Sequence, residues 1–191
     1  MQDPDPQLIR AAAAGDVRAF ADLVRQVQGH VWRFLLHLVG DADLAADLTQ
    51  DTLVKAYRAL DGFRFESSFS TWLFRIARNC ATDHFRRSAR QVRLVTQVAE
   101  TTRSHTPDAS SAVEVKAAVA ALPPHLREVF VLVEVFGLRY REAAAVLDIP
   151  DGTVKSRMFN ARRSLVEWFG AQTDAVSGPS PNPSAEEAGD G

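Results

Sequence analysis

Apolar residues recur at helical spacing over most of this chain, in two blocks separated by a polar stretch. Residues 8–90 and 112–170 carry apolar side chains at intervals of three and four, which is typical of amphipathic helices. Residues 91–111 are polar, with several Thr and Ser and one Pro, as in a linker. The pattern predicts an all-α protein with two small helical domains joined by a flexible linker.

The two ends of the chain differ from these blocks. Residues 1–7 are acidic and interrupted by proline, and we interpret them as an N-terminal extension. Residues 171–191 contain three Pro, three Gly and three Ser, with four acidic side chains and no basic one. A segment of this composition cannot bury a core, so we expect a disordered acidic tail.

Several helix boundaries are marked by capping residues. Gly40 is expected to end one helix, and Asp41 or Asp43 to cap the next. Ser68 or Ser70 is expected to cap the helix that follows an aromatic loop. Each of these residue types satisfies backbone groups that a helix end leaves without a partner.

The segment Val129–Phe136 is ambiguous by its local pattern. Its β-branched residues favour a strand. Apolar residues at i, i+3, i+4 and i+7 favour a helix instead. The preceding Pro123-Pro124 suits a helix start and the following Gly137 suits a helix end. We therefore expect a helix here.

Composition excludes several classes of protein. The chain has 191 residues, of which 46% are hydrophobic and 24% charged. Its longest apolar run, Ala117–Leu122, is far shorter than the roughly 20 residues that span a membrane. The start of the chain lacks a signal-peptide pattern, and the single Cys80 rules out an intrachain disulfide and a multi-cysteine zinc site. We expect a cytoplasmic protein without membrane insertion, metal or cofactor.

The net charge of −2 conceals two basic stretches. Residues 63–93 carry seven arginines against two acidic side chains, and residues 153–163 carry four basic side chains and no acidic one. Basic stretches in an acidic background indicate a polyanionic partner, most often nucleic acid. Either stretch alone is also compatible with a merely solvated helix.

The second block contains the pattern of a helix-turn-helix. A short helix over Tyr140–Asp148 is followed by the turn Ile149–Gly152 and a basic amphipathic helix over 153–169. In this motif the second helix enters the major groove of DNA. Its polar face carries Lys155, Ser156, Phe159, Asn160 and Arg163. Phe159 is either an ordinary exposed aromatic or a contact to thymine methyl groups.

The helix expected over 71–88 has a second face suited to nucleic acid. Arginine, asparagine and tryptophan side chains share it, and they suit phosphate contacts, base-edge contacts and stacking. Phe63, Phe65 and Phe69 lie in the preceding loop, where Phe63 and Phe69 could equally close a small core. Cys80 and His84 lie on the inner face, and we interpret them as core residues.

A third face lies on the helix expected over 41–60. Asp47, Gln50, Asp51 and Val54 share one side of this helix. Such a face is usually only solvated, although an exposed Val54 among acidic residues hints at a protein partner.

Three strings of residues together resemble the extracytoplasmic-function sigma factors of bacterial RNA polymerase. They are DLTQDTLVKAYRALDGFR, FSTWLFRIARNCATDHFRR and LPPHLREVFVLVEVFGLRYREAAAVLDIPDGTVKSRMFNARRSL. Their order and spacing match the family over roughly residues 16–170. The resemblance implies a dissociable specificity subunit of RNA polymerase and not an enzyme, with a region-two-like domain over 8–90 and a region-four-like domain over 112–170.

The resemblance also implies partners and roles for the three faces. Asp47, Gln50, Asp51 and Val54 would bind the clamp helices of the largest subunits of core polymerase. In the family an unstacked base is captured at the minus-ten promoter element. The resemblance implies that this element is contacted by Phe63, Phe65, Trp72, Arg75, Arg78, Asn79 and Arg86. Those implied to contact the minus-thirty-five element are Thr153, Lys155, Ser156, Arg157, Phe159, Asn160 and Arg163. An anti-sigma factor is a further expected partner.

The sequence departs from the family pattern at two positions. Asn160 stands where many members carry Arg, and Arg139 stands where a Ser or Thr cap is common. Two other classes of function account for less of the sequence. An operator-binding helix-turn-helix regulator would account for residues 137–170 alone, and a helical enzyme or ligand-binding module has no supporting motif.

Overall fold

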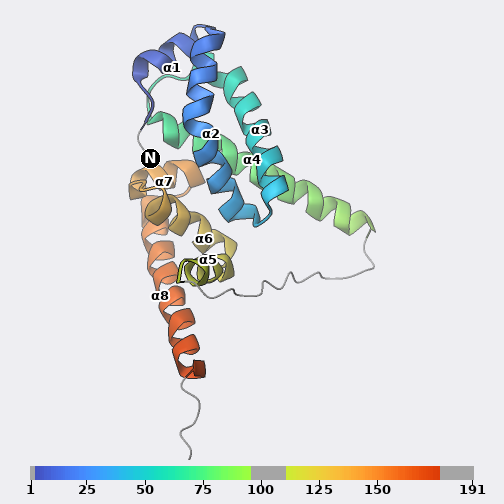
Figure 1. Cartoon of the computed structure of the whole chain (residues 1–191), viewed down its shortest axis with the longest axis vertical. Coiled ribbons are helices and arrows are strands. Elements are labelled where there is room, and N and C mark those ends of the chain that lie inside the picture. The colour runs from blue at the N-terminus through green and yellow to red at the C-terminus, as the bar shows by residue number, and fades with distance from the viewer. Residues whose placement is uncertain (1–2, 96–110, 177–191) are drawn as a thin grey trace, which may run out of the picture.

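The computed structural model describes residues 3–95 and 111–176 of the chain, and every regular element in these two ranges is helical (Figure 1). The prediction of an all-α protein is confirmed. The α-helices are α1 (Pro6–Ala13), α2 (Val17–Val39), α3 (Ala42–Ala59), α4 (Phe69–Val95), α5 (Ser111–Ala121), α6 (Pro124–Phe130), α7 (Tyr140–Leu147) and α8 (Asp151–Val176). A 3-10 turn, η1 (Leu60–Gly62), follows α3, and a π-helical turn, η2 (Val131–Val135), continues α6.

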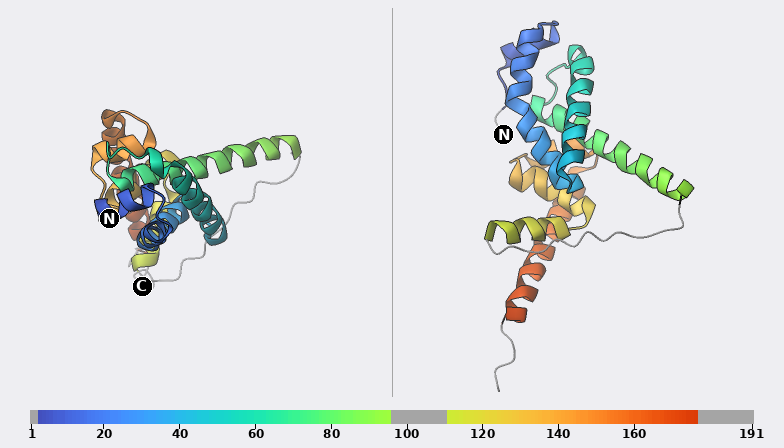
Figure 2. Two further views of the ribbon diagram at one scale, coloured as in Figure 1. Left: turned by 90° about the horizontal axis from the view of Figure 1, so that it is seen from above. Right: turned by 45° about the vertical axis from the view of Figure 1, so that its right-hand side comes forward.

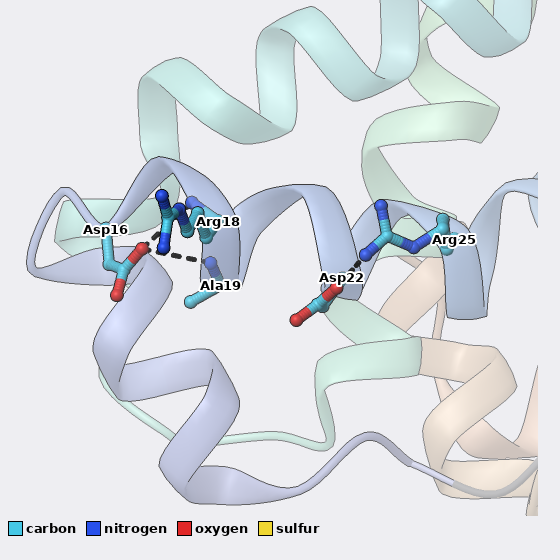
Figure 3. A network of polar contacts seen from close by, with 5 residues as sticks. All are labelled: Asp16, Arg18, Ala19, Asp22 and Arg25. Atoms are coloured by element: carbon cyan, nitrogen blue, oxygen red, sulfur yellow. Dashed lines mark hydrogen bonds and ion pairs between the residues drawn. The ribbon is translucent and has the colours of Figure 1, made fainter.

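Aspartate side chains cap α2 and α3. Asp16 accepts hydrogen bonds from the backbone N–H groups of Arg18 and Ala19 at 2.8 and 3.1 Å (Figure 3). Asp41, and not Asp43, caps α3 by accepting from Asp43 and Leu44 at 3.1 and 2.9 Å. These bonds satisfy N–H groups that have no partner within the helix.

Glycine ends two helical segments in the left-handed conformation. Gly40 has a φ of 70° at the end of α2, as predicted, and Gly137 has the same φ after η2. The segment Val129–Phe136 is helical, so the strand suggested by its β-branched residues is excluded. Burial explains this result, because Val129, Val131 and Leu132 are fully buried and pack in the core from helical positions.

The helix-turn-helix differs from its predicted form in one detail. Asp148 takes the left-handed conformation after α7, with a φ of 53°, and α8 begins already at Asp151. The turn therefore does not depend on Gly152, which lies inside the first turn of α8. Proline at position 150 suits this early start, because a helix does not need its N–H there.

Helices reach beyond the segment boundaries expected from composition. Helix α4 continues to Val95 and α8 to Val176, past the expected ends at 90 and 170. At the other end, α1 already begins at Pro6, within the expected extension. The rest of the expected linker and of the expected tail, residues 96–110 and 177–191, lies outside the described residues.

The two helical domains pack directly against each other. Helix α4 of the N-terminal domain lies along α7, and α2 contacts α6 (Figure 2). At this contact the ring of Phe136 packs against Phe34 and Phe74, with ring centroids 5.9 and 4.9 Å apart. All three rings are buried. The sequence pattern predicted two tethered domains and did not predict this contact.

Replacing Phe136 by alanine tests the contribution of this contact. Loss of a buried phenylalanine removes apolar burial and leaves a cavity between the domains, so Phe136→Ala should lower the free energy of unfolding by about 3–5 kcal/mol. Urea unfolding of the full chain measures this change. The exposed ring of Phe85 on α4 offers a control, and Phe85→Ala should change stability little. Equal losses in the two variants would contradict the assigned role of Phe136.

Candidate nucleic-acid and polymerase interfaces

Helix α4 exposes a polar face next to the loop that precedes it. Arg75, Asn79 and Arg86 are exposed, and Trp72 is half-buried at the edge of this face. The opposite side of α4 is buried and includes Leu73, a member of the N-terminal core. The basic and amide side chains predicted to meet nucleic acid therefore share one accessible surface.

The loop before α4 is built on an aromatic cluster. Phe63 is buried and its ring centroid lies 4.8, 5.7 and 5.2 Å from those of Phe65, Phe69 and Trp72. Phe65 itself is 41% exposed. The loop thus exposes Phe65 and part of Trp72 to solvent, while the buried ring of Phe63 packs against both of them. Of the two interpretations considered for Phe63, burial favours the core role over direct contact with a base.

A hollow of about 300 Å³ opens beside this cluster. That volume is at the small end of typical ligand sites. Its lining residues are Gly62, Phe63, Arg64, Glu66, Ser67, Trp72 and Arg75. Sequence reasoning missed Arg64, Glu66 and Ser67, although their place within the aromatic loop was a signal for them.

Arg78 points to the C-terminal domain and not to the exposed face of α4. Its Nε lies 3.7 Å from Glu128 Oε1 of α6, and the two side chains are 25% and 20% exposed. Burial raises the pKa of Glu128 above its usual range, while the nearby Arg78 and Arg157 oppose that shift. In this arrangement Arg78 is engaged by another domain of the same chain.

Helix α8 presents most of its predicted recognition residues to solvent. Lys155, Ser156, Phe159 and Arg163 are exposed, and Phe159 reaches 67%. Thr153, Arg157 and Asn160 are half-buried. The stripe of Val154, Met158 and Ala161 is buried on the other side, as its spacing predicted.

The first helix of the motif has a cap that replaces the missing Ser or Thr. Glu142 accepts a hydrogen bond from the backbone N–H of Arg139 at 2.7 Å. A carboxylate three residues into a helix is one half of a capping box. The arginine at position 139 is therefore compatible with an ordered start of α7.

The acidic face of α3 is fully accessible. Asp47, Gln50 and Asp51 are exposed, and Val54 is 49% exposed. Tyr57, one turn further along, is 50% exposed and packs edge-on against Phe20 of α2 at 4.7 Å. Sequence reasoning did not include Tyr57, although its spacing of three from Val54 was a signal for it.

The part of the chain that the structure describes has neither a membrane-spanning helix nor a cluster of metal ligands. None of its helices is long and apolar enough to cross a membrane. No group of three or more His, Cys, Asp or Glu side chains there is placed to hold a metal ion.

Comparison with protein families assigns both domains. Residues 23–91 match Sigma-70 region 2, and residues 112–165 match Sigma-70 region 4. The first match includes α3, the aromatic loop and most of α4, and the second includes the helix-turn-helix. Each predicted DNA-contacting face therefore lies in a matched region.

Similar proteins extend over almost the whole chain. The RNA polymerase sigma-H factor of Pseudomonas aeruginosa is 36% identical over 86% of this chain and 93% of its own length. The sigma factor SigC of Mycobacterium tuberculosis is also 36% identical, over 90% and 93%. The sigma-E factor of Escherichia coli is 33% identical over 84% and 92%. The chain belongs to the extracytoplasmic-function family of RNA polymerase sigma factors.

Two solved structures of similar fold are complexes with a second protein. One is the sigma factor RpoE in complex with the anti-sigma factor NepR from Bartonella quintana. It has a TM-score of 0.68 and 30% identity over 81% of this chain and 98% of that one. Another is CnrH in complex with the cytosolic domain of CnrY, with a TM-score of 0.65 and 32% identity over 88% and 96%.

The raised pKa of Glu128 predicts a specific pH dependence of stability. When folding raises the pKa of a carboxyl group, the folded protein is stabilised by the protonated form of that group. This stabilisation is complete below the pKa of the unfolded state, which is about 4.3 for glutamate. It is lost as the pH rises through the raised pKa of the folded state. Glu128→Gln keeps the shape without the charge. The variant should therefore exceed the wild type in free energy of unfolding at about pH 8 and equal it near about pH 4.

Urea unfolding across this pH range measures the difference between the two proteins. Glu114→Gln, at an exposed position on α5, is the matched control and should show no such convergence. A difference between Glu128→Gln and the wild type that stays constant with pH would contradict the role of burial.

Proposed function

We propose that this sigma factor joins core RNA polymerase through α3 and reads promoter DNA with the exposed faces of α4 and α8. The single observation that carries the proposal is the hollow lined by Phe63 and Trp72, which adjoins the basic face of α4. The protein acts as an initiation factor and has no catalytic activity of its own. It acts in the cytoplasm, where it meets polymerase and DNA.

At the minus-ten element the loop and α4 would act on a base that has left the duplex. Unpairing a base costs a few kcal/mol, and stacking on aromatic rings offsets this cost. Phe65 and Trp72 supply the exposed aromatic surface. Arg75, Asn79 and Arg86 would hold the adjoining strand by phosphate and base-edge contacts. The protein would thereby stabilise the opened promoter.

At the minus-thirty-five element α8 would enter the major groove. Lys155 and Arg163 would contact phosphates or base edges, and Phe159 would pack on thymine methyl groups. Thr153, Ser156, Arg157 and Asn160 complete the proposed surface. Ser156 donates a hydrogen bond to the carbonyl oxygen of Thr153 at 3.0 Å, so its hydroxyl keeps acceptor capacity for DNA.

The closed packing of the two domains would have to open on a promoter. The names of the minus-thirty-five and minus-ten elements give their positions, which differ by about 25 base pairs. At about 3.4 Å per base pair this separation is about 85 Å. We propose that the interdomain contact, where the rings of Phe74 and Phe136 lie 4.9 Å apart, separates so that α4 and α8 reach both elements. Opening would also release Arg78 from Glu128 for contact with DNA. The sigma factor RpoE of Bartonella quintana is bound to an anti-sigma factor in its solved structure, and we propose such a partner for this chain.

Reversing one charge on α3 tests the polymerase interface. Asp51→Arg should abolish binding to core polymerase and leave the fold intact, because the side chain is exposed. Binding of labelled protein to bacterial core polymerase, followed by run-off transcription from a genomic promoter pool, measures both effects. Asp22→Arg on α2 makes the same charge change and loses only a surface ion pair with Arg25. Normal core binding by Asp51→Arg would refute the docking face.

Truncating one lysine on α8 tests the upstream contact. Lys155→Ala should weaken initiation at promoters that carry a minus-thirty-five element by about 1–3 kcal/mol. Promoters from the run-off experiment, with and without that element, provide the templates, and the exposed Lys116→Ala on α5 is the control. Equal loss on both kinds of template would show that Lys155 acts elsewhere. Tight binding of wild-type protein to duplex DNA without polymerase would favour an operator-binding regulator instead.

A further inference from the structure

The first residues of the chain contact both ends of the aromatic loop. The Sigma-70 region 2 match begins only at residue 23, so the segment Asp3–Ala13 lies outside it. Helix α1 nevertheless packs on α2 and against η1, from which the loop departs. Ile9 is 2% exposed and belongs to the N-terminal core, which anchors the segment beside the loop.

Asp3 completes the hydrogen bonding of the first turn of α4. Its carboxylate accepts from the backbone N–H groups of Phe69 and Ser70 at 2.8 and 3.0 Å, and also from the Ser70 hydroxyl. The next N–H, that of Thr71, donates to the Ser68 hydroxyl at 3.1 Å. Ser68 is thus the local cap. Asp3, which lies 66 positions before Phe69 in the sequence, satisfies the two N–H groups that Ser68 does not reach.

Arg10 contacts the loop at its exposed aromatic ring. Its guanidinium carbon lies 5.1 Å from the centroid of the Phe65 ring, within the range of a cation–π interaction. Phe65 has a φ of 58°, a left-handed conformation that bulky residues rarely adopt. A residue in that conformation keeps it only where its surroundings hold it there. Arg10 and Phe63 both contact the Phe65 ring, Phe63 with its ring centroid 4.8 Å away.

We propose that Asp3 and Arg10 are positioning residues for base capture: they hold the loop over 63–68 and the start of α4 in the geometry that receives an unpaired nucleobase. The proposal rests on the proposed function of the hollow. Asp3 fixes the first turn of α4, which includes Trp72 and precedes the turn that carries Arg75, and Arg10 fixes Phe65. Neither residue needs to touch the base. Asp3 acts through Trp72 and Arg75, which line the hollow, and Arg10 acts through Phe65, whose ring packs on the lining residue Phe63.

The test compares promoter opening on duplex and premelted templates. Full-length Asp3→Asn and Arg10→Ala variants are assembled with core polymerase on a promoter identified by run-off transcription. Permanganate reactivity of unpaired thymines measures the rate of opening on the duplex template, and the rate of run-off initiation is compared between the duplex and premelted templates. Misplaced binding groups are expected to slow opening of the duplex on the order of tenfold. A template with a premelted minus-ten region should restore most of the rate, because its base no longer has to be captured from a duplex.

Matched controls separate positioning from general destabilisation. Asp22→Asn and Arg25→Ala make the same chemical changes at an exposed ion pair on α2 (Figure 3), and both should open the duplex at the wild-type rate. Arg10→Lys retains a cation over Phe65 and should recover part of the lost rate. Thermal unfolding and core binding of each variant identify any loss of folded protein.

Phe65→Ala distinguishes failure of this proposal from failure of the function on which it rests. If Phe65→Ala slows opening but Asp3→Asn and Arg10→Ala do not, the positioning role is wrong and the loop's function stands. If all three open the duplex at the wild-type rate, the proposed function of the hollow fails as well. If Asp3→Asn and Arg10→Ala lose activity equally on duplex and premelted templates, they act on folding or assembly, and the positioning role is refuted.

Discussion

Burial of helix α4 on two sides is the constraint on which the rest of the structure depends. Leu73 and Ala77 pack in the N-terminal core, and Phe74 meets Phe136 of the C-terminal domain. A helix has a limited circumference, so burying two of its sides leaves one for solvent. That remaining side carries Arg75 and Asn79. The same packing that stabilises the fold thus decides which side chains of α4 are accessible to a partner.

The aromatic loop shows how an exposed functional element can be kept in one conformation. Its ring at position 63 is buried and its ring at position 65 is exposed, so the loop is supported from inside while it presents a flat apolar surface outside. Segments far apart in the chain supply the remaining support, because Asp3 bonds to the start of α4 and Arg10 lies over Phe65. Rigid placement of a binding group reduces the entropy lost when a ligand binds.

Much of the candidate site could be predicted from local patterns. Helical periodicity placed Lys155 and Phe159 opposite Val154 and Met158, and the structure exposes the first pair and buries the second. The same reasoning was less successful for Arg78. Its position on the flank of α4 is compatible with DNA contact by spacing alone, yet it faces Glu128, a residue 50 positions away. Periodicity predicts the direction of a side chain relative to its own helix, but it does not predict which neighbouring element the side chain contacts.

The sequence by itself determined the helices, several of their caps, the polar faces and the family, because each depends on residues within a few positions of one another or on motif order. Only the tertiary structure decided that the two domains meet through Phe34, Phe74 and Phe136, and that Asp3 completes the start of α4. These contacts join residues separated by dozens of positions. They form only when particular helix faces pack together to exclude water, and that choice depends on the shape and burial of the whole chain.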